Sequence, residues 1–263
     1  MKKAIFFDID GTLLDCFGGI RNITPKVKDA INTLQSNGHY VFIATGRPYA
    51  FLSQAILDFG FDGFILANGA HIIMNNKTIY KDPINSTFIK NIVSEFEKLN
   101  IQYILEGELY SYMKSSCKEF YAFYDSIGIS RQHLKNDYNL SDIDTYKVEM
   151  LCPDEKAVNF CLSLVNNNPD YDYFHSIDEK SFELYSKKNT KATGILNVLK
   201  LLNIPIKDSY AFGDGKNDIE MLSTVGCGIA MGNSSDEVKK CASKITDTVH
   251  NDGVAIGINK YIL

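Results

Sequence analysis

The stretch Met1–Leu14, MKKAIFFDIDGTLL, decides the fold. Its apolar run from Ala4 to Phe7 shows no polar alternation, which is typical of a short strand buried on both faces in a parallel sheet. The run ends in Asp8 and Asp10, and residues at i and i+2 of an extended chain point to the same side. Two neighbouring carboxylates repel each other, and a hard divalent cation such as Mg²⁺, with phosphate oxygens around it, is the usual partner of such a pair.

The composition is that of an ordinary globular protein. The chain has 263 residues, of which 45% are hydrophobic and 22% charged, a length that suits one large domain or two smaller ones. The net charge of -5 gives no basic excess, so we expect no nucleic-acid partner. No apolar run approaches the roughly 20 residues of a membrane span, and the N-terminal run is too short for a signal peptide. We therefore expect a cytoplasmic protein with no membrane partner.

The six cysteines indicate neither a zinc site nor a disulfide framework. None forms a C-x-x-C pair, and the five histidines do not cluster with them. We expect reduced thiols.

Strands and helices alternate after the first motif. Thr24-Pro25 predicts the start of a helix that ends at Gly38 and buries the stripe Val27, Ala30, Ile31 and Leu34. Further strands are predicted at 40–44 and 64–67, with a helix at about 49–57 between them. This β-α-β-α-β order predicts a parallel sheet with right-handed crossovers, in which ligands bind beyond the carboxyl ends of the strands. Asp8, Thr45 and Asn68 stand at such ends.

The regular alternation is interrupted in the middle of the chain. A hairpin is predicted at 71–74 and 78–80. The following segment mixes both element types without strand-end acids: helices are predicted at 86–99, 116–126 and 154–165, and strands at 101–105, 109–113, 146–152, 171–175 and 182–185, whereas 128–144 remains unassigned. We interpret residues 83–185 as an α+β insert in an α/β domain made of residues 1–82 and 186–263.

The alternation resumes at Thr190. Helices are predicted at 190–202, after Asp218 through Leu222, and at 254–261, and strands at 209–212 and 227–231. The strand at 209–212 runs into Gly213-Asp214-Gly215-Lys216-Asn217-Asp218, and the strand at 227–231 ends in Gly232-Asn233, a turn that we expect to shape the fold.

Four motifs therefore stand in chain order: Asp8-x-Asp10, Thr45-Gly46, Lys191, and Gly213-Asp214-x-x-Asn217-Asp218. In order and position they resemble the haloacid dehalogenase-like (HAD) phosphohydrolases, and more narrowly the Cof-type phosphatases. That group carries an α/β (C2B-type) cap between its second and third motifs, where this chain has its insert. The resemblance implies a Rossmann-like core at 1–82 and 186–263, and a cap at 83–185 that sets substrate specificity.

The resemblance implies a Mg²⁺-dependent phosphatase. Asp8 would be the nucleophile that forms an aspartyl-phosphate, and Asp10 the general acid that later acts as a base on water. The metal would be held by Asp8, by the backbone carbonyl of Asp10 and by Asp214. Gly11 and Thr12 would support this loop.

Phosphate binding would fall to a second group of residues. Thr45 offers a hydroxyl, Gly46 an unhindered amide and Lys191 a positive charge at a helix start. Asn217 would join them, and with Asp218 it would orient Lys191 and the metal-site loop. The family usually has Lys-Gly at the third motif, whereas this chain has Lys191-Ala192, so nearby Lys187 and Lys188 stay open as alternatives.

The substrate would be a small phosphorylated metabolite, such as a sugar phosphate or a cofactor phosphate, because a large cap would keep a folded phosphoprotein from Asp8. Arg47 and Asn68 are candidates for contacts on the substrate side, although a surface ion pair explains Arg47 equally well and Asn68-Gly69 is most simply a turn. Two other functions stay open: a phosphomutase on the same scaffold, and a non-catalytic protein that binds a phosphometabolite. The oligomeric state is not predicted.

Overall fold

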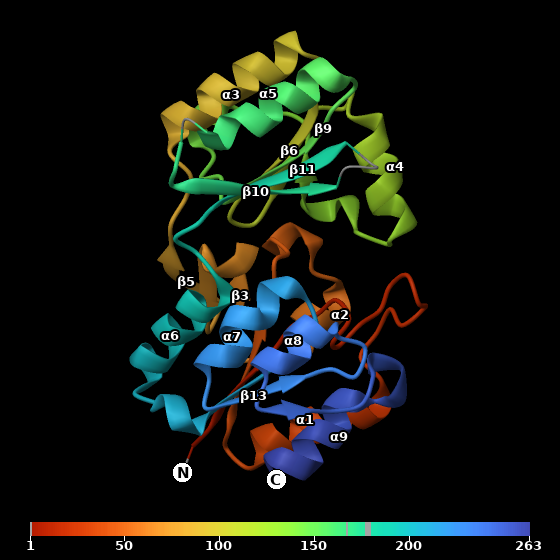
Figure 1. Cartoon of the computed structure of the whole chain (residues 1–263), viewed down its shortest axis with the longest axis vertical. Helices are drawn as coiled ribbons and strands as arrows, with labels where there is room; N and C mark the ends of the chain where they lie inside the picture. The colour runs from red at the N-terminus through yellow and green to blue at the C-terminus, as the bar shows by residue number, and fades with distance from the viewer. Residues whose placement is uncertain (1, 167, 177–179) are drawn as a thin grey trace. The chain divides into compact units, whose positions relative to one another are not determined.

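The computed structural model describes residues 2–166, 168–176 and 180–263, which divide into two compact units (Figure 1). Unit 1 comprises Met1–Gly46, Gln54–Tyr80 and Thr190–Leu263, and unit 2 comprises Arg47–Ser53 and Lys81–Asn189. The predicted insert thus falls inside unit 2, which also contains the short segment Arg47–Ser53 that the sequence placed in the core. The role of unit 2 as a specificity cap stays a proposal.

Unit 1 is built on an eight-stranded sheet. Its strands, in spatial order, are β14 (Lys244–Ile245), β13 (Cys227–Ala230), β12 (Ser209–Gly213), β1 (Ala4–Phe7), β2 (Tyr40–Ala44), β3 (Gly63–Leu66), β4 (His71–Met74) and β5 (Lys77–Lys81). The strands from β14 to β3 are parallel, and β4 pairs antiparallel to β3. The predicted parallel sheet is confirmed. Since Phe7 is in register with Phe212 and Ile43, the residues after β1, β2 and β12 emerge at one edge.

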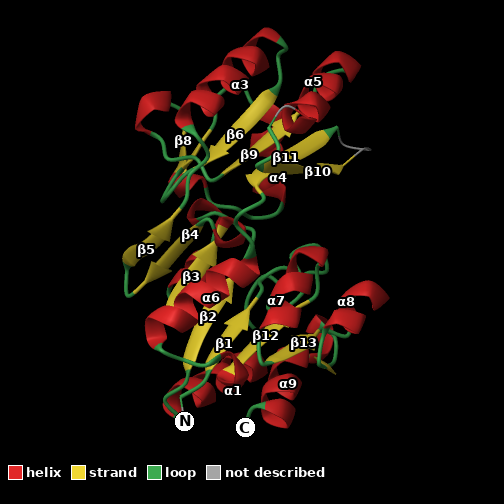
Figure 2. Cartoon of the chain, turned by 60° about the vertical axis from the view of Figure 1, so that its left-hand side comes forward, coloured by secondary structure: helices red, strands yellow, loops and turns green. Residues whose placement is uncertain are grey.

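Helices cover both faces of this sheet (Figure 2). They are α1 (Pro25–Ser36), α2 (Gln54–Leu57), α6 (Lys191–Leu202), α7 (Ile219–Thr224), α8 (Asp236–Cys241) and α9 (Gly253–Tyr261), with 3₁₀ turns η2 (Ala67–Gly69), η5 (Ile206–Asp208), η6 (Lys216–Asp218) and η7 (Val249–Asn251). The inner faces of α6, α7 and α8 pack on Phe6 and its neighbours. On the other face α1 packs against α9, whose Gly257 contacts Phe212. The strands from β13 to β3 are therefore buried on both sides, as their unbroken apolar runs predict, whereas the edge strands β14 and β5 are exposed.

The local signals at helix ends are largely confirmed. Thr24 caps α1 by accepting from the Val27 amide at 3.4 Å, and the predicted apolar stripe of this helix is buried.

The predicted helix at 49–57 is wrong. It is replaced by the 3₁₀ turn η1 (Tyr49–Phe51) and by α2, because Ala50 and Phe51 pack in unit 2 whereas α2 belongs to unit 1. The short elements α8 and β14 were not predicted.

Unit 2 is an α+β fold around a six-stranded sheet. Its strands, in spatial order, are β10 (Tyr171–Ser176), β11 (Ser181–Ser186), β9 (Lys147–Leu151), β6 (Gln102–Glu106), β7 (Ser111–Tyr112) and β8 (Leu134–Lys135), all antiparallel except for the pair β7–β8. Its helices are α3 (Ser86–Lys98), α4 (Lys118–Ser126) and α5 (Glu155–Asn166), with η3 (Arg131–His133) and η4 (Leu140–Asp142) in the stretch that the sequence left unassigned. Helices α3 and α5 pack on one face of the sheet.

The opposite face of this sheet carries a charged cluster, in which Glu106 and Lys147 are buried, Glu149 is half-buried and Glu183 is partly exposed. The ammonium nitrogen of Lys147 lies 3.1 Å from Glu106 Oε1 and 3.0 Å from Glu183 Oε2. The hydroxyl of Tyr124 donates to Glu149. Burial, opposed by the charge of Lys147, raises the pKa of Glu106 well above its usual range. The one cation of this cluster therefore compensates several carboxylates.

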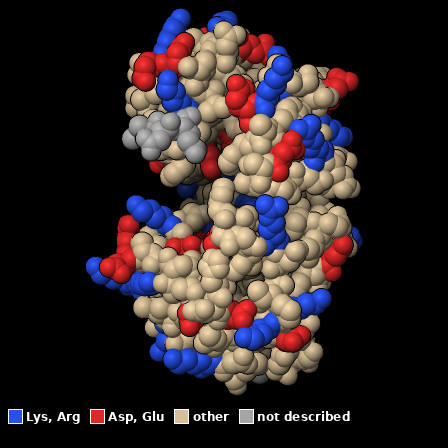
Figure 3. Space-filling model, turned by 90° about the vertical axis from the view of Figure 1, so that its right-hand side faces the viewer, with Lys and Arg blue, Asp and Glu red and all other residues tan. Residues whose placement is uncertain are grey.

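None of the helices in the described part of the chain is long and apolar enough to cross a membrane. On the face shown in Figure 3, Lys and Arg side chains alternate with Asp and Glu side chains. All six cysteines are free thiols.

Replacing Lys147 by Met should destabilise the protein strongly. The substitution keeps most of the side-chain volume but leaves Glu106 and Glu183 without their cation, and breaking a buried ion pair in this way costs about 3–5 kcal/mol. Urea unfolding measures this loss. Lys156→Met, on the exposed surface of α5, is the control and should change the unfolding free energy by less than about 0.5 kcal/mol. Equal losses in the two variants would contradict the importance of the cluster.

Candidate active site

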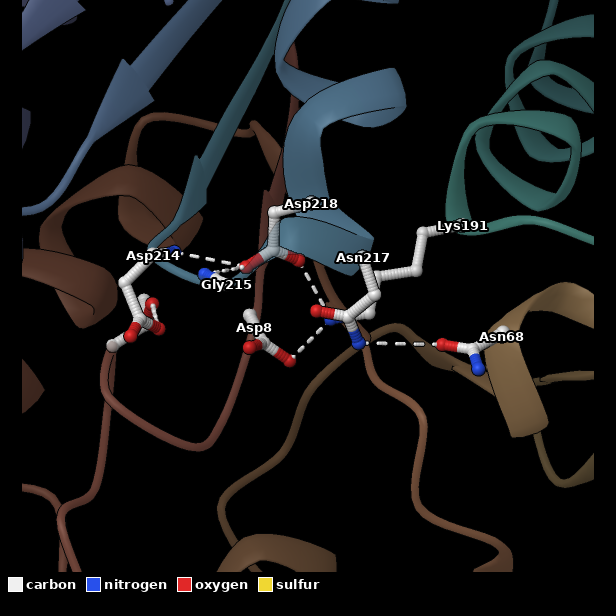
Figure 4. Close-up of polar contacts among 8 residues, drawn as sticks. Asp8, Asn68, Lys191, Asp214, Gly215, Asn217 and Asp218 are labelled. Atoms are coloured by element: carbon white, nitrogen blue, oxygen red, sulfur yellow. Dashed lines mark hydrogen bonds and ion pairs between the residues drawn. The ribbon is translucent and has the colours of Figure 1, made fainter. Parts of the chain in front are cut away.

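Three acidic side chains meet at the carboxyl edge of the unit 1 sheet (Figure 4). Asp8 follows β1 directly, and its backbone amide donates to Phe212 O at 3.0 Å, which holds it beside β12. Asp214 and Asp218 come from the loop after β12. One carboxylate oxygen from each of the three acids lies within 4.8 Å of the others. Residues separated by about 200 positions in the sequence thus form one site.

The ammonium group of Lys191 lies between two of these acids. Its Nζ is 2.7 Å from Asp8 Oδ1 and 2.6 Å from Asp218 Oδ1, and the side chain is 1% exposed. Burial alone would lower the pKa of Lys191, but Asp218 and Asp8 raise it above its usual value, so the group stays protonated. Lys191 is the first residue of α6, as predicted. Lys188 instead pairs with Asp82 in unit 2 at 3.1 Å.

Asp218 organises the loop around it. Its Oδ2 accepts from the backbone amides of Asp214 at 2.8 Å and Gly215 at 2.9 Å, while Oδ1 accepts from Lys191. Both oxygens of this fully buried carboxylate are therefore engaged. Such a residue supports its neighbours and has little capacity left to bind a ligand.

The carboxylate of Asp214 lies directly over Gly11. Thr12 Oγ1 donates to Asp214 Oδ1 at 3.1 Å. A Cβ atom on Gly11 would stand 2.1 Å from Asp214 Oδ2, and Gly11 has a φ of +76°, so both the close approach and the backbone require glycine. Burial and the charge of Asp218 raise the pKa of Asp214 to about 6, although the hydrogen bond from Thr12 lowers it.

The pKa of Asp8 is raised as well. Burial first, and then the charge of Asp218, raise its pKa well above the usual range, while Lys191 opposes this shift. The charge of Asp10 also contributes to raising it, which places the exposed Asp10 close to Asp8. A cation at this site would favour the ionised form of Asp8.

The remaining predicted residues fall into two groups. The amide nitrogen of Asn217 donates to Asn68 Oδ1 at 3.4 Å, and a Cβ atom on Gly46 would stand 3.1 Å from that same oxygen. The backbone N–H of Asn68 donates to the backbone carbonyl of the buried Thr45 at 3.1 Å. These four residues therefore gather in unit 1, and Figure 4 shows the hydrogen bond between Asn217 and Asn68. Arg47 belongs to unit 2, where one of its guanidinium N–H groups donates to Phe51 O at 3.0 Å.

The donor set suits a hard divalent cation. Carboxylate and carbonyl oxygens are the ligands that Mg²⁺ prefers. When all are ionised, Asp8, Asp10, Asp214 and Asp218 bring four negative charges, against which Lys191 brings one positive charge. This excess of negative charge at a partly buried site is what a bound cation would compensate.

Sequence reasoning missed one residue of the site. Asn233, on the loop after β13, donates from Nδ2 to Gly11 O at 2.9 Å and to Asp214 Oδ2 at 3.4 Å. Asn233 follows the carboxyl end of β13, a strand adjacent to β12, and this position could have indicated a site residue. The sequence analysis instead assigns Gly232-Asn233 to a turn that shapes the fold.

The family model described as haloacid dehalogenase-like hydrolase matches residues 5–258, nearly the whole chain. This chain belongs to that family. The hydrolase is 31% identical over 265 residues to YkrA of Bacillus subtilis, a match that covers 98% of this chain and 97% of YkrA. It is 27% identical over 276 residues to the 5-amino-6-(5-phospho-D-ribitylamino)uracil phosphatase YitU of Bacillus subtilis, covering 98% of this chain and 96% of YitU.

Solved structures agree with this assignment. A protein from Geobacillus kaustophilus superposes on the hydrolase with a TM-score of 0.87 at 30% identity, covering 99% of this chain and 98% of the other. BT4131, described as a subclass IIB sugar phosphatase, superposes with a TM-score of 0.80 at 26% identity and covers 99% of each chain. The hydrolase is therefore a phosphatase of this family, an enzyme that acts on phosphoric monoesters.

The raised pKa of Asp214 predicts a pH dependence of stability. Its folded value of about 6 lies above the ordinary value of 3.8, so its contribution to stability is full below pH 3.8 and is lost as the pH rises through 6. In Mg²⁺-free buffer the unfolding free energy of the hydrolase should fall between pH 4 and 7, and the fall should be smaller in Asp214→Asn. Urea unfolding at each pH tests this. Asp29→Asn, on the exposed surface of α1, should follow the wild type, and an unchanged slope in Asp214→Asn would refute the shift.

Proposed function

We propose that this hydrolase is a Mg²⁺-dependent phosphatase that acts on a small phosphorylated metabolite through an aspartyl-phosphate on Asp8. The observation that carries the proposal is the position of Asp8, which is buried and paired with Lys191 beside Asp214 and Asp218. This arrangement supplies a carboxylate nucleophile together with positive charge for a phosphoryl group, which is what phosphoryl transfer requires.

Two acids share the covalent steps. An oxygen of Asp8 attacks phosphorus while the bond to the leaving oxygen breaks, and Asp10 gives its proton to that oxygen. Asp10, now ionised, takes a proton from a water molecule, whose oxygen attacks the same phosphorus. The bond from phosphorus to Asp8 breaks, inorganic phosphate leaves, and both acids return to their starting states. The exposure of Asp10 suits this exchange with substrate and water.

Neighbouring groups neutralise and orient the phosphoryl oxygens. Lys191 contributes a charge fixed by Asp218, and Thr45, Gly46 and Asn217 contribute hydrogen-bond donors on loops of the same unit. Asn68 holds Asn217 in place and thus supports this group.

The carboxylates of Asp8 and Asp214 and the backbone carbonyl of Asp10 would hold the metal ion. When bound, Mg²⁺ supplies the positive charge that lets an anionic carboxylate approach an anionic phosphate. Asp218 would remain outside this ligand set, because it is fully buried and its oxygens already accept three short hydrogen bonds of 2.6 to 2.9 Å, whereas those to Asp214 are longer.

Unit 2 would act as the cap that selects the leaving group and excludes bulk water. Two related proteins support a small phosphorylated metabolite as the substrate: the uracil-derivative phosphatase YitU and the sugar phosphatase BT4131. The names of these two proteins are compatible with the proposed substrate class, which is a sugar phosphate or a cofactor phosphate. Arg47, which lies in unit 2, stays a candidate for a contact with such a substrate.

A panel of phosphorylated metabolites tests the proposal, with phosphate release measured with and without Mg²⁺. The panel should include sugar phosphates, phosphorylated cofactor precursors and p-nitrophenyl phosphate as a simple aryl ester. We expect release from p-nitrophenyl phosphate and from at least one metabolite, in both cases abolished by EDTA and restored by Mg²⁺. Activity only in the presence of a sugar bisphosphate activator would indicate a phosphomutase, and binding without turnover would indicate a non-catalytic protein.

Replacing Asp8 by Asn should abolish turnover without unfolding the chain. The amide is close in size to the carboxylate but cannot attack phosphorus, and removal of a nucleophile lowers kcat by about 10³-fold or more. Steady-state kinetics measure the loss, and circular dichroism checks the fold. The surface variant Asp29→Asn should retain wild-type kinetics. Undiminished phosphatase activity in Asp8→Asn would refute the assignment of the nucleophile.

A further inference from the structure

The side-chain amide of Asn233 connects three segments of unit 1. Its Nδ2 donates to Gly11 O at 2.9 Å and to Asp214 Oδ2 at 3.4 Å, and its Oδ1 accepts from the Val249 amide at 2.9 Å. Because a backbone N–H can only donate, the bond from Val249 determines which end of the amide is the oxygen. The donor end of Asn233 therefore faces the carbonyl and the carboxylate.

Asp214 depends on such contacts for its orientation. The terminal torsion of an aspartate side chain is broad and roughly two-fold, so the torsion alone does not fix where the two oxygens point. Thr12 donates to Oδ1 at 3.1 Å and Asn233 donates to Oδ2, so each oxygen is held by a different loop. Loss of either bond would let the carboxylate rotate.

The side-chain amide of Asn233 also helps to fix the loop that carries Asp10. The backbone N–H of Gly11 donates to Leu14 O at 2.7 Å, and the backbone carbonyl of Gly11 accepts from Asn233. The N–H of Gly11 and the carbonyl of Asp10 belong to one peptide group. The peptide groups on both sides of Gly11 are therefore held, and the direction of the Asp10 carbonyl is held with them.

We propose that Asn233 is a positioning residue for the divalent-cation site. It orients the carboxylate of Asp214 directly and the peptide groups around Gly11 indirectly, so that the oxygens assigned to the metal face the same point. The inference rests on the proposed function, because the cation is the Mg²⁺ of the proposed phosphatase. Residues that orient metal ligands typically change metal affinity by about 10–100-fold when they are removed.

Thermal unfolding in a series of MgCl₂ concentrations tests the inference without relying on turnover. A ligand that binds only the folded state raises Tm with its concentration, which gives an apparent dissociation constant. Wild-type protein should show this rise, and Asn233→Ala should need about tenfold more Mg²⁺ for the same rise. Asn233→Ser serves the same purpose if the alanine variant does not fold.

Asn251→Ala is the matched control. It removes an exposed side-chain amide in the neighbouring turn η7, which donates to Asp247 Oδ1 at 3.0 Å, and leaves all three hydrogen bonds of Asn233 in place. Its Tm without metal should fall, whereas its Mg²⁺ dependence should match the wild type.

The outcomes separate this inference from the proposed function. Wild-type Mg²⁺ dependence in Asn233→Ala, or an equal loss in Asn251→Ala, would overturn the role of Asn233 and leave the phosphatase proposal intact. A wild-type protein that neither gains stability from Mg²⁺ nor releases phosphate would overturn both.

Discussion

The ammonium group of Lys191 is the constraint on which the site depends. It lies between Asp8 and Asp218, and all three side chains are almost fully buried. Two buried carboxylates this close would repel each other and would lose their hydration without compensation, so the site can be buried only while the lysine stays charged. The position of Lys191 at the first residue of α6 fixes that charge to the end of a helix packed on the sheet.

Around this charge, two acids of one loop have different environments. Asp218 is saturated by Lys191 and by two backbone amides, so it serves the structure of the loop. Asp214 accepts longer hydrogen bonds from Thr12 and Asn233, and its pKa is raised to about 6. The local hydrogen bonds, and not the residue type, decide which carboxylate can serve a cation.

The sequence predicted much of this because the strongest signals are local. Buried parallel strands appear as apolar runs, as at β1 and β2, and the acids directly after them must share one edge of the sheet. The predicted helix at 49–57 failed because its two halves pack in different units, which periodicity does not reveal. Asn233 was missed because its contacts with Gly11 and Asp214 are tertiary, and a Gly-Asn turn looks the same with or without them.

The segment Arg47–Ser53 has a consequence for dissecting the molecule. It follows Gly46 directly in the chain, yet its Ala50 and Phe51 lie in an apolar cluster of unit 2. A single deletion of Lys81–Asn189 would thus leave unit 1 with an apolar loop directly after Gly46, and the residues that bury this loop would be missing. An isolated unit 1 therefore has to be engineered at two places in the chain, with a polar replacement for 47–53 as well as a new connection across 81–189.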